Sequence, residues 1–234
     1  MTTLSAALEQ SWLLLTSLDR ALLDIVELSL CVSLTAVAIG ALIGLPAGAA
    51  IAVGNFPGRR VLVVLLNALM GMPPVVVGLM VYLMLSRAGP LGSLGILFTP
   101  AAMVIAQTLL IAPIIAALAR QIVEDAWHEY QDYLRSLGSG TLRTVRTLLW
   151  DTRFSLITVL LAGLGRAAAE VGAVIVVGGN IEGVTRVMTT AIALETSKGD
   201  LPLALALGMV LLALVLTINA SAFVLSEAAR RRFG

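Results

Sequence analysis

The sequence predicts an all-α integral membrane protein with five transmembrane helices and one long polar loop. Of its 234 residues, 59% are hydrophobic and only 12% are charged, and the mean hydropathy is +1.01. A soluble domain is nearer half apolar and a quarter charged. The apolar residues also form long runs, and a helix needs about 20 of them to cross a bilayer.

Five such runs define the domain organisation that we expect. Residues 1–19 hold too few apolar residues to cross and predict an amphipathic segment lying at the interface. Residues 20–234 then form a single transmembrane domain. Its spans are expected at 28–53, 61–85, 97–119, 154–177 and 201–226, with a cytoplasmic loop at 120–153 and an outer loop at 178–200.

The basic residues predict the orientation, because Lys and Arg are enriched on the cytoplasmic side of membrane proteins. If loop 120–153 is cytoplasmic, most of the arginines fall on that side, which places the N-terminus outside and the C-terminus inside. The cytoplasmic set is Arg59, Arg60, Arg120, Arg135, Arg143, Arg146, Arg153, Arg230, Arg231 and Arg232; the outer set is Arg20, Arg87, Arg186 and Lys198.

Small residues and prolines interrupt the spans. Gly40, Gly44 and Gly48 recur at four-residue spacing and form a ridge along one helix face, where another helix can approach closely. Prolines fall in three spans, and a proline in a membrane helix frees backbone carbonyls that need other partners. These prolines are Pro46, the pair Pro73 and Pro74, and Pro113. Each is compatible with a simple packing kink, but their recurrence favours a protein with a path through it.

Loop 120–153 is amphipathic. Apolar residues recur at helical spacing up to Leu137, and the "LGSG" stretch at 137–140 is expected to end the helix at a glycine. Such an apolar stripe is expected to be buried against another surface, and a partner protein is the simplest candidate for that surface.

The stretch "DYLRSLG" (132–138) resembles the E-A-A-x-x-x-G motif of the permease subunits of ABC-type importers. Asp132 stands for the glutamate and Gly138 for the glycine, while Tyr133 and Leu134 replace the alanines. The motif's downstream proline is replaced by Asp151. The resemblance implies a coupling helix that contacts the ATP-binding subunit through Glu129, Asp132, Tyr133, Leu134, Leu137 and Gly138.

A second resemblance covers residues 165–208. The runs "EVGA", "GGNI" and "TRVMTTAIALETSKGD" are similar to the C-terminal half of tungstate permeases, within the wider molybdate, sulfate and tungstate group, and "GMPPVVVGL" is similar to that group's second span. The matching positions are Glu170, Gly172, Gly179, Asn180, Arg186, Thr189, Thr190, Glu195, Lys198, Gly199 and Asp200.

The resemblance implies a permease of the prokaryotic inner membrane that works as a homodimer. Two ATP-binding subunits would hold the ATP and Mg²⁺, a binding protein outside would deliver the oxyanion, and this chain itself would bind no cofactor. The sequence contains no G-x-x-x-x-G-K-[ST] motif that would bind ATP. Molybdate or sulfate remains an alternative substrate, and an ion-coupled secondary transporter is an alternative mechanism. An intramembrane enzyme would need a set of catalytic partners that one cysteine, Cys31, and one histidine, His128, do not supply.

Two charges lie within the expected fourth span, at Arg166 and Glu170. Residues four apart share a helix face, so the two side chains can pair. A lone charge near the bilayer centre costs at least about 2.5–3.5 kcal/mol on insertion scales, which favours such pairing. Two interpretations stay open, an intramembrane ion pair that orients the helix and a lining of the translocation path. Pro73, Pro74 and Asn180 are the other candidates for the path.

Overall fold

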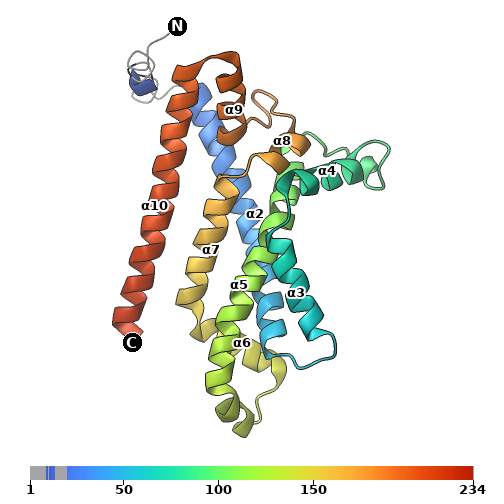
Figure 1. Ribbon diagram of the computed structural model, residues 1–234, viewed down its shortest axis with the longest axis vertical. Helices are drawn as coiled ribbons and strands as arrows, with labels where there is room; N and C mark the ends of the chain where they lie inside the picture. Colours follow the sequence, from blue (N-terminus) through green and yellow to red (C-terminus); the bar gives the residue numbers. More distant parts are fainter. Residues whose placement is uncertain (1–8, 10, 14–19, 234) are drawn as a thin grey trace. The chain divides into compact units, whose positions relative to one another are not determined.

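Helices make up the regular structure of the chain in the computed structural model, which describes residue 9, residues 11–13 and residues 20–233 (Figure 1). No strand occurs among these residues. The expected interfacial segment, 1–19, therefore lies mostly outside the described residues. The elements are α2 (Arg20–Val53), α3 (Arg59–Met70), α4 (Pro74–Leu85), η1 (Gly92–Leu94), α5 (Pro100–Ser136), α6 (Thr141–Asp151), α7 (Arg153–Ala168), α8 (Gly172–Gly178), α9 (Met188–Lys198) and α10 (Leu201–Phe233).

The chain divides into two compact units, which are described here one at a time. The first comprises residues 1–35, 73–107 and 167–217, and the second comprises residues 36–72, 108–166 and 218–234. Four helices, α2, α5, α7 and α10, contribute residues to both units.

The lengths and apolar composition of the helices agree with the predicted all-α membrane fold. Within the described part of the chain, three helices are long and apolar enough to cross a bilayer: α2, α5 and the 201–221 part of α10. Two pairs of shorter helices, α3 with α4 and α6 with α7, are bent at a short break, and each pair can supply one further span. The total then reaches five.

The helix ends differ from the expected spans at three places. The second span is broken after Met70, and Pro73 and Pro74 begin a new helix. The third helix does not stop at residue 119, because α5 continues to Ser136 as one helix. The fourth span is interrupted at residues 169–171, between α7 and α8. Pro46 and Pro113, in contrast, lie inside continuous helices.

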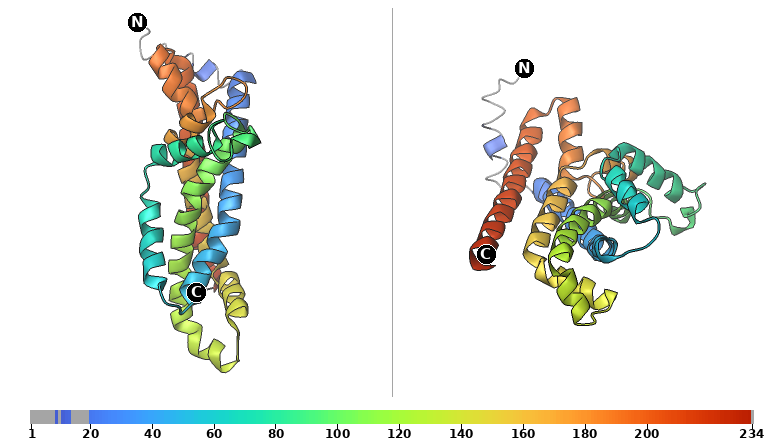
Figure 2. Two further views of the ribbon diagram at one scale, coloured as in Figure 1. Left: turned by 90° about the vertical axis from the view of Figure 1, so that its right-hand side faces the viewer. Right: turned by 60° about the horizontal axis from the view of Figure 1, so that its bottom comes forward.

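In the second unit, α2 and α5 run side by side because glycines remove the side chains between them (Figures 1 and 2). A Cβ atom at Gly44 would lie 2.9 Å from the carbonyl oxygen of Ala112, and one at Gly48 would overlap the carbonyl oxygen of Ala116. The predicted ridge of small residues is therefore the surface on which α5 packs. Such close approach lets helices gain van der Waals contact where lipid offers no hydrophobic driving force.

An apolar cluster in the same unit joins the end of α2 to α5 and α6. Its buried members are Ala49, Ala52, Val123, Leu134 and Leu148. Leu148 belongs to α6, so this cluster holds α6, which lies within the polar loop, against α2 and α5.

The first unit has its own core, formed by the start of α2, by α9 and by the start of α10. Leu22, Met188, Ala191, Ala206 and Leu207 are its buried residues. In the same unit, α4 packs on α8. A Cβ atom at Gly78 of α4 would come within 2.8 Å of the Cα atom of Ala173, so this crossing also depends on a glycine.

The glycine ridge predicts a position-specific response to added methyl groups. Gly48→Ala is expected to lower the melting temperature of the purified protein, because the new Cβ meets backbone atoms that cannot rotate away. Gly40→Ala is the matched control, since its Cβ would meet its nearest neighbours at 3.5 Å. Alanine is also the better helix former by about 1 kcal/mol, so this variant should melt at the same temperature or higher. Equal melting temperatures for both variants would contradict this packing.

Candidate functional site

Within the polar loop 120–153, α5 ends at a glycine in the left-handed conformation. Gly138 has φ = 66°. Its amide donates to the carbonyl of Arg135 at 2.9 Å, and the amide of Ser139 donates to the carbonyl of Leu134 at 3.1 Å. These two bonds form a Schellman motif, which satisfies the last carbonyls of a helix and needs a residue without a Cβ penalty. The prediction that "LGSG" ends the helix is confirmed.

Helix α6 begins at Thr141, and hydrogen bonds to the residues just before it hold its first turn. The amide of Thr144 donates to the carbonyl of Gly140 at 3.0 Å, and its hydroxyl lies 3.1 Å from that of Ser139. Thr144 and Leu148 are the buried residues of this helix. The turn between α5 and α6 is therefore rigid, and the opposite face of α6 is left exposed.

The six residues expected to contact an ATP-binding subunit divide into two groups. Glu129, Asp132, Tyr133, Leu137 and Gly138 are exposed. Leu134 is buried in the cluster with Leu148, so it acts by packing and is not available to a partner. The sequence pattern did not separate it from its neighbours because the direction of each side chain depends on where α6 packs.

Two exposed apolar residues of α6 were not among the candidates. Leu142 is 84% exposed and Trp150 is 71% exposed, beside Leu137 at 62%. A shallow groove of about 190 Å³ lies between the two helices of the loop; it is lined by Tyr130, Tyr133, Leu134, Thr147, Leu148 and Asp151. The exposed aromatic side chains of this groove, Tyr130 and Tyr133, are typical of a protein interaction site.

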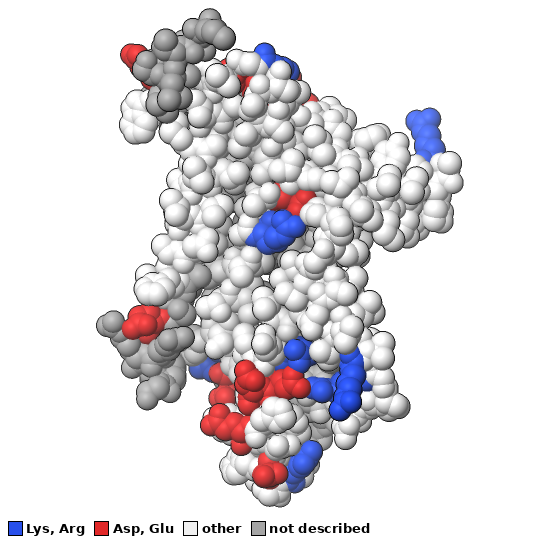
Figure 3. All heavy atoms as spheres, viewed as in Figure 1, with Lys and Arg blue, Asp and Glu red and all other residues white. Residues whose placement is uncertain are grey.

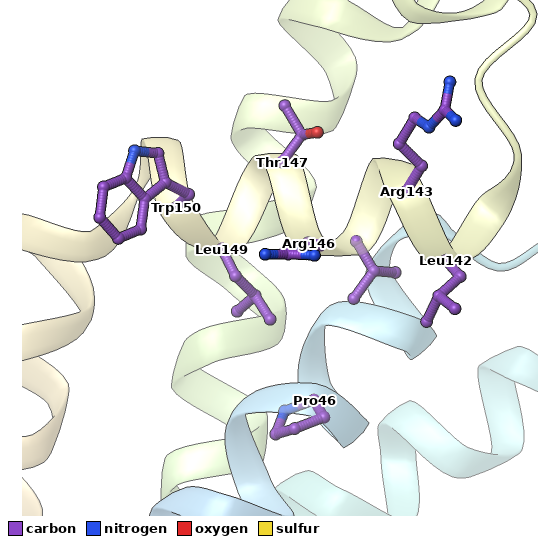
Figure 4. A pocket seen from close by; sticks show the side chains of 8 residues that line it. Pro46, Leu142, Arg143, Arg146, Thr147, Leu149 and Trp150 are labelled. Carbon is purple, nitrogen blue, oxygen red and sulfur yellow. The ribbon is translucent and has the colours of Figure 1, made fainter.

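A larger open hollow, of about 870 Å³, lies between α6 and α2. Figure 4 shows Leu142 and Leu149 pointing from α6 toward Pro46 of α2, while Arg143 and Thr147 point the other way. Leu142 and Leu149 thus face α2, whereas Thr147 and Arg143 face away from it.

Charged side chains gather around α6 and the end of α5, as Figure 3 shows. Three of them form a cluster that the sequence reading missed, in which Glu124 is paired with both Arg59 and Arg120. Arg59 also donates from Nε to the carbonyl of Ile51 at 2.8 Å, at the end of α2. A cation there complements the negative end of the helix dipole. The signal in the sequence was an arginine placed directly after the "GNFPG" turn.

The pKa of Glu124 follows from this cluster. Burial alone acts to raise the pKa, but the hydrogen bond from Arg59 and the charges of Arg120, Arg59 and His128 outweigh it, so the net shift is downward. The carboxylate therefore stays ionised at neutral pH. Nearby, the negative charges of Glu129 and Asp151 raise the pKa of Tyr130.

Glu170 lies in the break between α7 and α8, where it serves both helix ends. Its carboxylate accepts from the amide of Ala173 at 3.1 Å, inside the first turn of α8. Its own amide donates to the carbonyl of Ala167 at 3.2 Å, and its carbonyl accepts from the hydroxyl of Thr189 at 2.8 Å. The side chain is 5% exposed. Glu170 therefore holds the backbone together where the helix is interrupted.

Arg166 lies in the last turn of α7, which ends at Ala168. Glu170 is outside that helix, so the expected placement of the two residues on one continuous helix face does not hold. Arg166 is exposed, whereas Glu170 is buried. Which role Arg166 has, in a path or in an ion pair, remains a prediction.

Asn180 begins the turn between α8 and α9 in the left-handed conformation, with φ = 51° directly after Gly179. Its Nδ2 donates to the carbonyl of Thr190 at 3.3 Å. In the same turn the hydroxyl of Thr185 donates to the carbonyl of Gly178 at 2.6 Å and accepts from the amide of Ile181 at 2.9 Å. Side chains thus supply the partners that the backbone lacks between α8 and α9.

Pro73 precedes α4 as its N-cap, and Pro74 is the first residue of that helix. Pro74 occupies the first turn, where its missing N–H would have no partner in any case. The carbonyl of Pro73 accepts from the amide of Val76 at 3.0 Å. These two prolines therefore define a helix start, where the sequence had indicated an interruption within one span.

Long apolar helices, bent helix pairs and an exposed helical loop are consistent with a membrane transport subunit. The chain belongs to the family of binding-protein-dependent transport system inner membrane components, whose family model matches residues 40–233. The permeases of type I ABC importers make up this family, so the predicted all-α fold class and inner-membrane location are confirmed. The orientation of the two termini stays a prediction.

Similar proteins point to a group within the family. The tungstate uptake system permease protein TupB of Peptoclostridium acidaminophilum is 42% identical over 92% of this chain and 94% of its own length. A probable anion ABC transporter permease protein of Haloferax volcanii is 41% identical over 85% of this chain and 88% of its own length. The sulfate transport system permease protein CysW of Synechococcus elongatus is more distant, at 30% identity over 73% of this chain and 62% of its own length.

The ion-pair cluster predicts a pH-dependent contribution to stability. Glu124→Gln removes the charge that two arginines share and should destabilise the protein by about 1–2 kcal/mol at neutral pH, the range for a partly exposed charged hydrogen bond. Because the pKa of Glu124 is lowered from 4.5, its contribution is complete above pH 4.5 and is lost as the pH falls through the lowered pKa.

Thermal unfolding of the purified protein in detergent as a function of pH measures this contribution. Asp125→Asn is the matched control, because Asp125 is the next residue on α5 and is exposed. We expect the difference in melting temperature between the native protein and Glu124→Gln to shrink below pH 4.5, while Asp125→Asn changes little at any pH. A difference that is constant down to pH 3 would contradict the assignment.

Proposed function

We propose that this chain is the transmembrane subunit of an ATP-driven importer that carries tungstate into the cell. The observation that supports this substrate most directly is the 42% identity to a tungstate permease along nearly the whole of both chains. The similarity to a probable anion permease at nearly the same level supports the wider class of oxyanions. Molybdate and sulfate are the alternative substrates, and sulfate is favoured less because the sulfate permease is more distant.

The working assembly contains two copies of this chain, two ATP-binding subunits and a binding protein outside the membrane. A single chain of this length supplies about five spans, and a pathway between two such bundles follows the symmetry usual for membrane oligomers. The N-terminus lies outside and the C-terminus inside. This chain binds no cofactor, and ATP and Mg²⁺ are held by the partner subunits, which carry out the hydrolysis.

The partner subunit docks on the exposed surface formed by Tyr133, Leu137, Gly138 and Leu142. These residues lie on a rigid support, because the Schellman motif fixes the turn and the buried Leu148 fixes α6. A force on this surface is passed to α2 and α5 through that cluster. ATP binding in the partner therefore moves transmembrane helices without any reacting group in this chain.

The translocation path needs only weak contacts with the anion, because a site that binds tightly also releases slowly. Pro73, Pro74 and Asn180 lie at helix breaks, where backbone groups and side chains can line a path. Arg166 is the basic candidate for attracting a dianion. Glu170 bonds to the backbone at its own break, which supports a positional role for it, and the ion pair with Arg166 stays an open interpretation.

Reconstitution into proteoliposomes tests the proposed function. The chain, its ATP-binding partner and its binding protein are expected to accumulate labelled tungstate only when ATP is enclosed with the ATP-binding subunits. Unlabelled molybdate and sulfate are added in excess to rank the anions by competition. Uptake that follows an ion gradient and needs no ATP would overturn the ABC mechanism; ATP-dependent uptake of sulfate but not tungstate would overturn the substrate.

Docking at the loop predicts a separate result for Leu137. Leu137→Asp introduces a charge at an exposed position, so we expect normal membrane insertion but at least a tenfold loss of ATP-binding subunit retained on copurification. Leu137→Met keeps an apolar side chain of similar size and serves as the matched control. Gly138→Ala should show an intermediate loss, because alanine is strained at φ = 66°. Full retention with Leu137→Asp would place the docking surface elsewhere.

A further inference from the structure

A small polar pocket lies inside the first unit. Its volume is about 10 Å³, and its polar lining is Ser29, Ser33, Gln107, Glu170 and Thr189. These residues come from α2, α5, the break after α7 and the start of α9. The rest of the lining is made of small apolar side chains.

Most of the polar atoms around this pocket already have partners in the protein. The hydroxyl of Ser29 donates to the carbonyl of Ile25 at 2.8 Å and accepts from the amide of Met188 at 2.7 Å. Thr189 and Glu170 are joined through the carbonyl of Glu170. These bonds hold the walls of the pocket in place.

Gln107 is the exception. Its Nε2 donates to the carbonyl of Ala167 at 3.2 Å, but its Oε1 is buried without a hydrogen-bond partner among the described residues. The residue is 4% exposed. Rotating the amide by 180° would not help, because Oε1 would then face the carbonyl oxygen of Ala167. The side chain is fixed with one acceptor in need of a donor.

The size and the polar lining of the pocket limit which molecule can donate a hydrogen bond to Oε1 of Gln107. A cavity of about 10–15 Å³ holds one water molecule, and a buried water needs two to four polar partners. A tetrahedral oxyanion is too large, and it would meet the acceptor oxygens of Gln107 and Glu170. The described residues also contain no group of three or more metal-ligating side chains. A single neutral donor fits where neither an anion nor a metal ion does.

We infer that this pocket is the site of one structural water molecule, which donates a hydrogen bond to Oε1 of Gln107. The hydroxyl of Ser33, which also lines the pocket, is the second partner. The water joins α2 and α5 to the residues just before the break at 169–171. It completes the hydrogen bonding of the break in a region where lipid supplies none. The pocket is therefore a structural site in this inference.

A structure of the assembled transporter in lipid nanodiscs, at a resolution that shows ordered water, tests the inference. We expect a peak about 2.7–3.2 Å from Oε1 of Gln107, within hydrogen-bonding distance of Ser33. A strong peak with several oxygens at about 2.0–2.6 Å would identify a metal ion and overturn it. A protein donor bonded to Oε1, with no peak in the pocket, would overturn it as well.

Two variants test whether the water needs the space inside the pocket. Ser33→Thr adds a methyl group at the pocket wall and should remove the peak and lower the melting temperature by a few degrees. Thr108→Val is the matched control, since Thr108 is a buried hydroxyl on α5 that does not line this pocket; it should leave the peak in place. A peak that persists unchanged in Ser33→Thr would contradict the assignment. Should either variant fail to fold, the map of the native protein decides alone.

Discussion

Every backbone group that a helix break exposes among apolar helices must find a partner inside the protein, because hydrocarbon offers none. This constraint explains the placement of the polar residues in the first unit. The break at 169–171 is held by Glu170, whose carboxylate, amide and carbonyl each make a bond. Thr185 bonds to the backbone of the turn between α8 and α9 in the same way. An unpaired buried polar group costs about 1–3 kcal/mol. By bonding to the exposed backbone groups, these side chains remove that cost at each helix break.

The second unit meets a different constraint, the need to pack helices without a hydrophobic driving force between them. Gly44 and Gly48 solve it by bringing the backbone of α2 onto that of α5. The same contact places the end of α2 beside α5, where Glu124 can join Arg59 to Arg120. The support of the loop follows from this arrangement. Leu134 and Leu148 pack on the end of α2, and the exposed surface around Leu137 is presented by a fixed turn.

The features of the candidate site that depend on neighbouring residues could be predicted from the sequence, whereas those that depend on distant segments could not. Gly138 was identified as a helix end because a left-handed turn at a helix C-terminus depends on a few adjacent residues. Leu134 was taken as a surface residue because its burial depends on α6, which comes later in the chain. Glu170 was expected on the same helix as Arg166, since nothing in the local pattern of alanines shows that α7 stops at Ala168. Arg120 and Glu124 are four residues apart and could have been paired from the sequence, but Arg59 lies 65 residues from Glu124, and no local pattern shows that it joins them.

The sequence by itself determined the membrane class, the approximate number of spans, the small-residue face of α2 and the presence of an amphipathic helical loop. These features depend on composition and on helical periodicity, which are properties of the chain read locally. Only the tertiary structure decided where the spans break, which loop residues face outward and which side chains serve the breaks. Those outcomes depend on contacts such as that between Gln107 and Ala167, or between Ser29 and Met188. Such contacts form between segments up to 159 residues apart, so no local pattern can specify them.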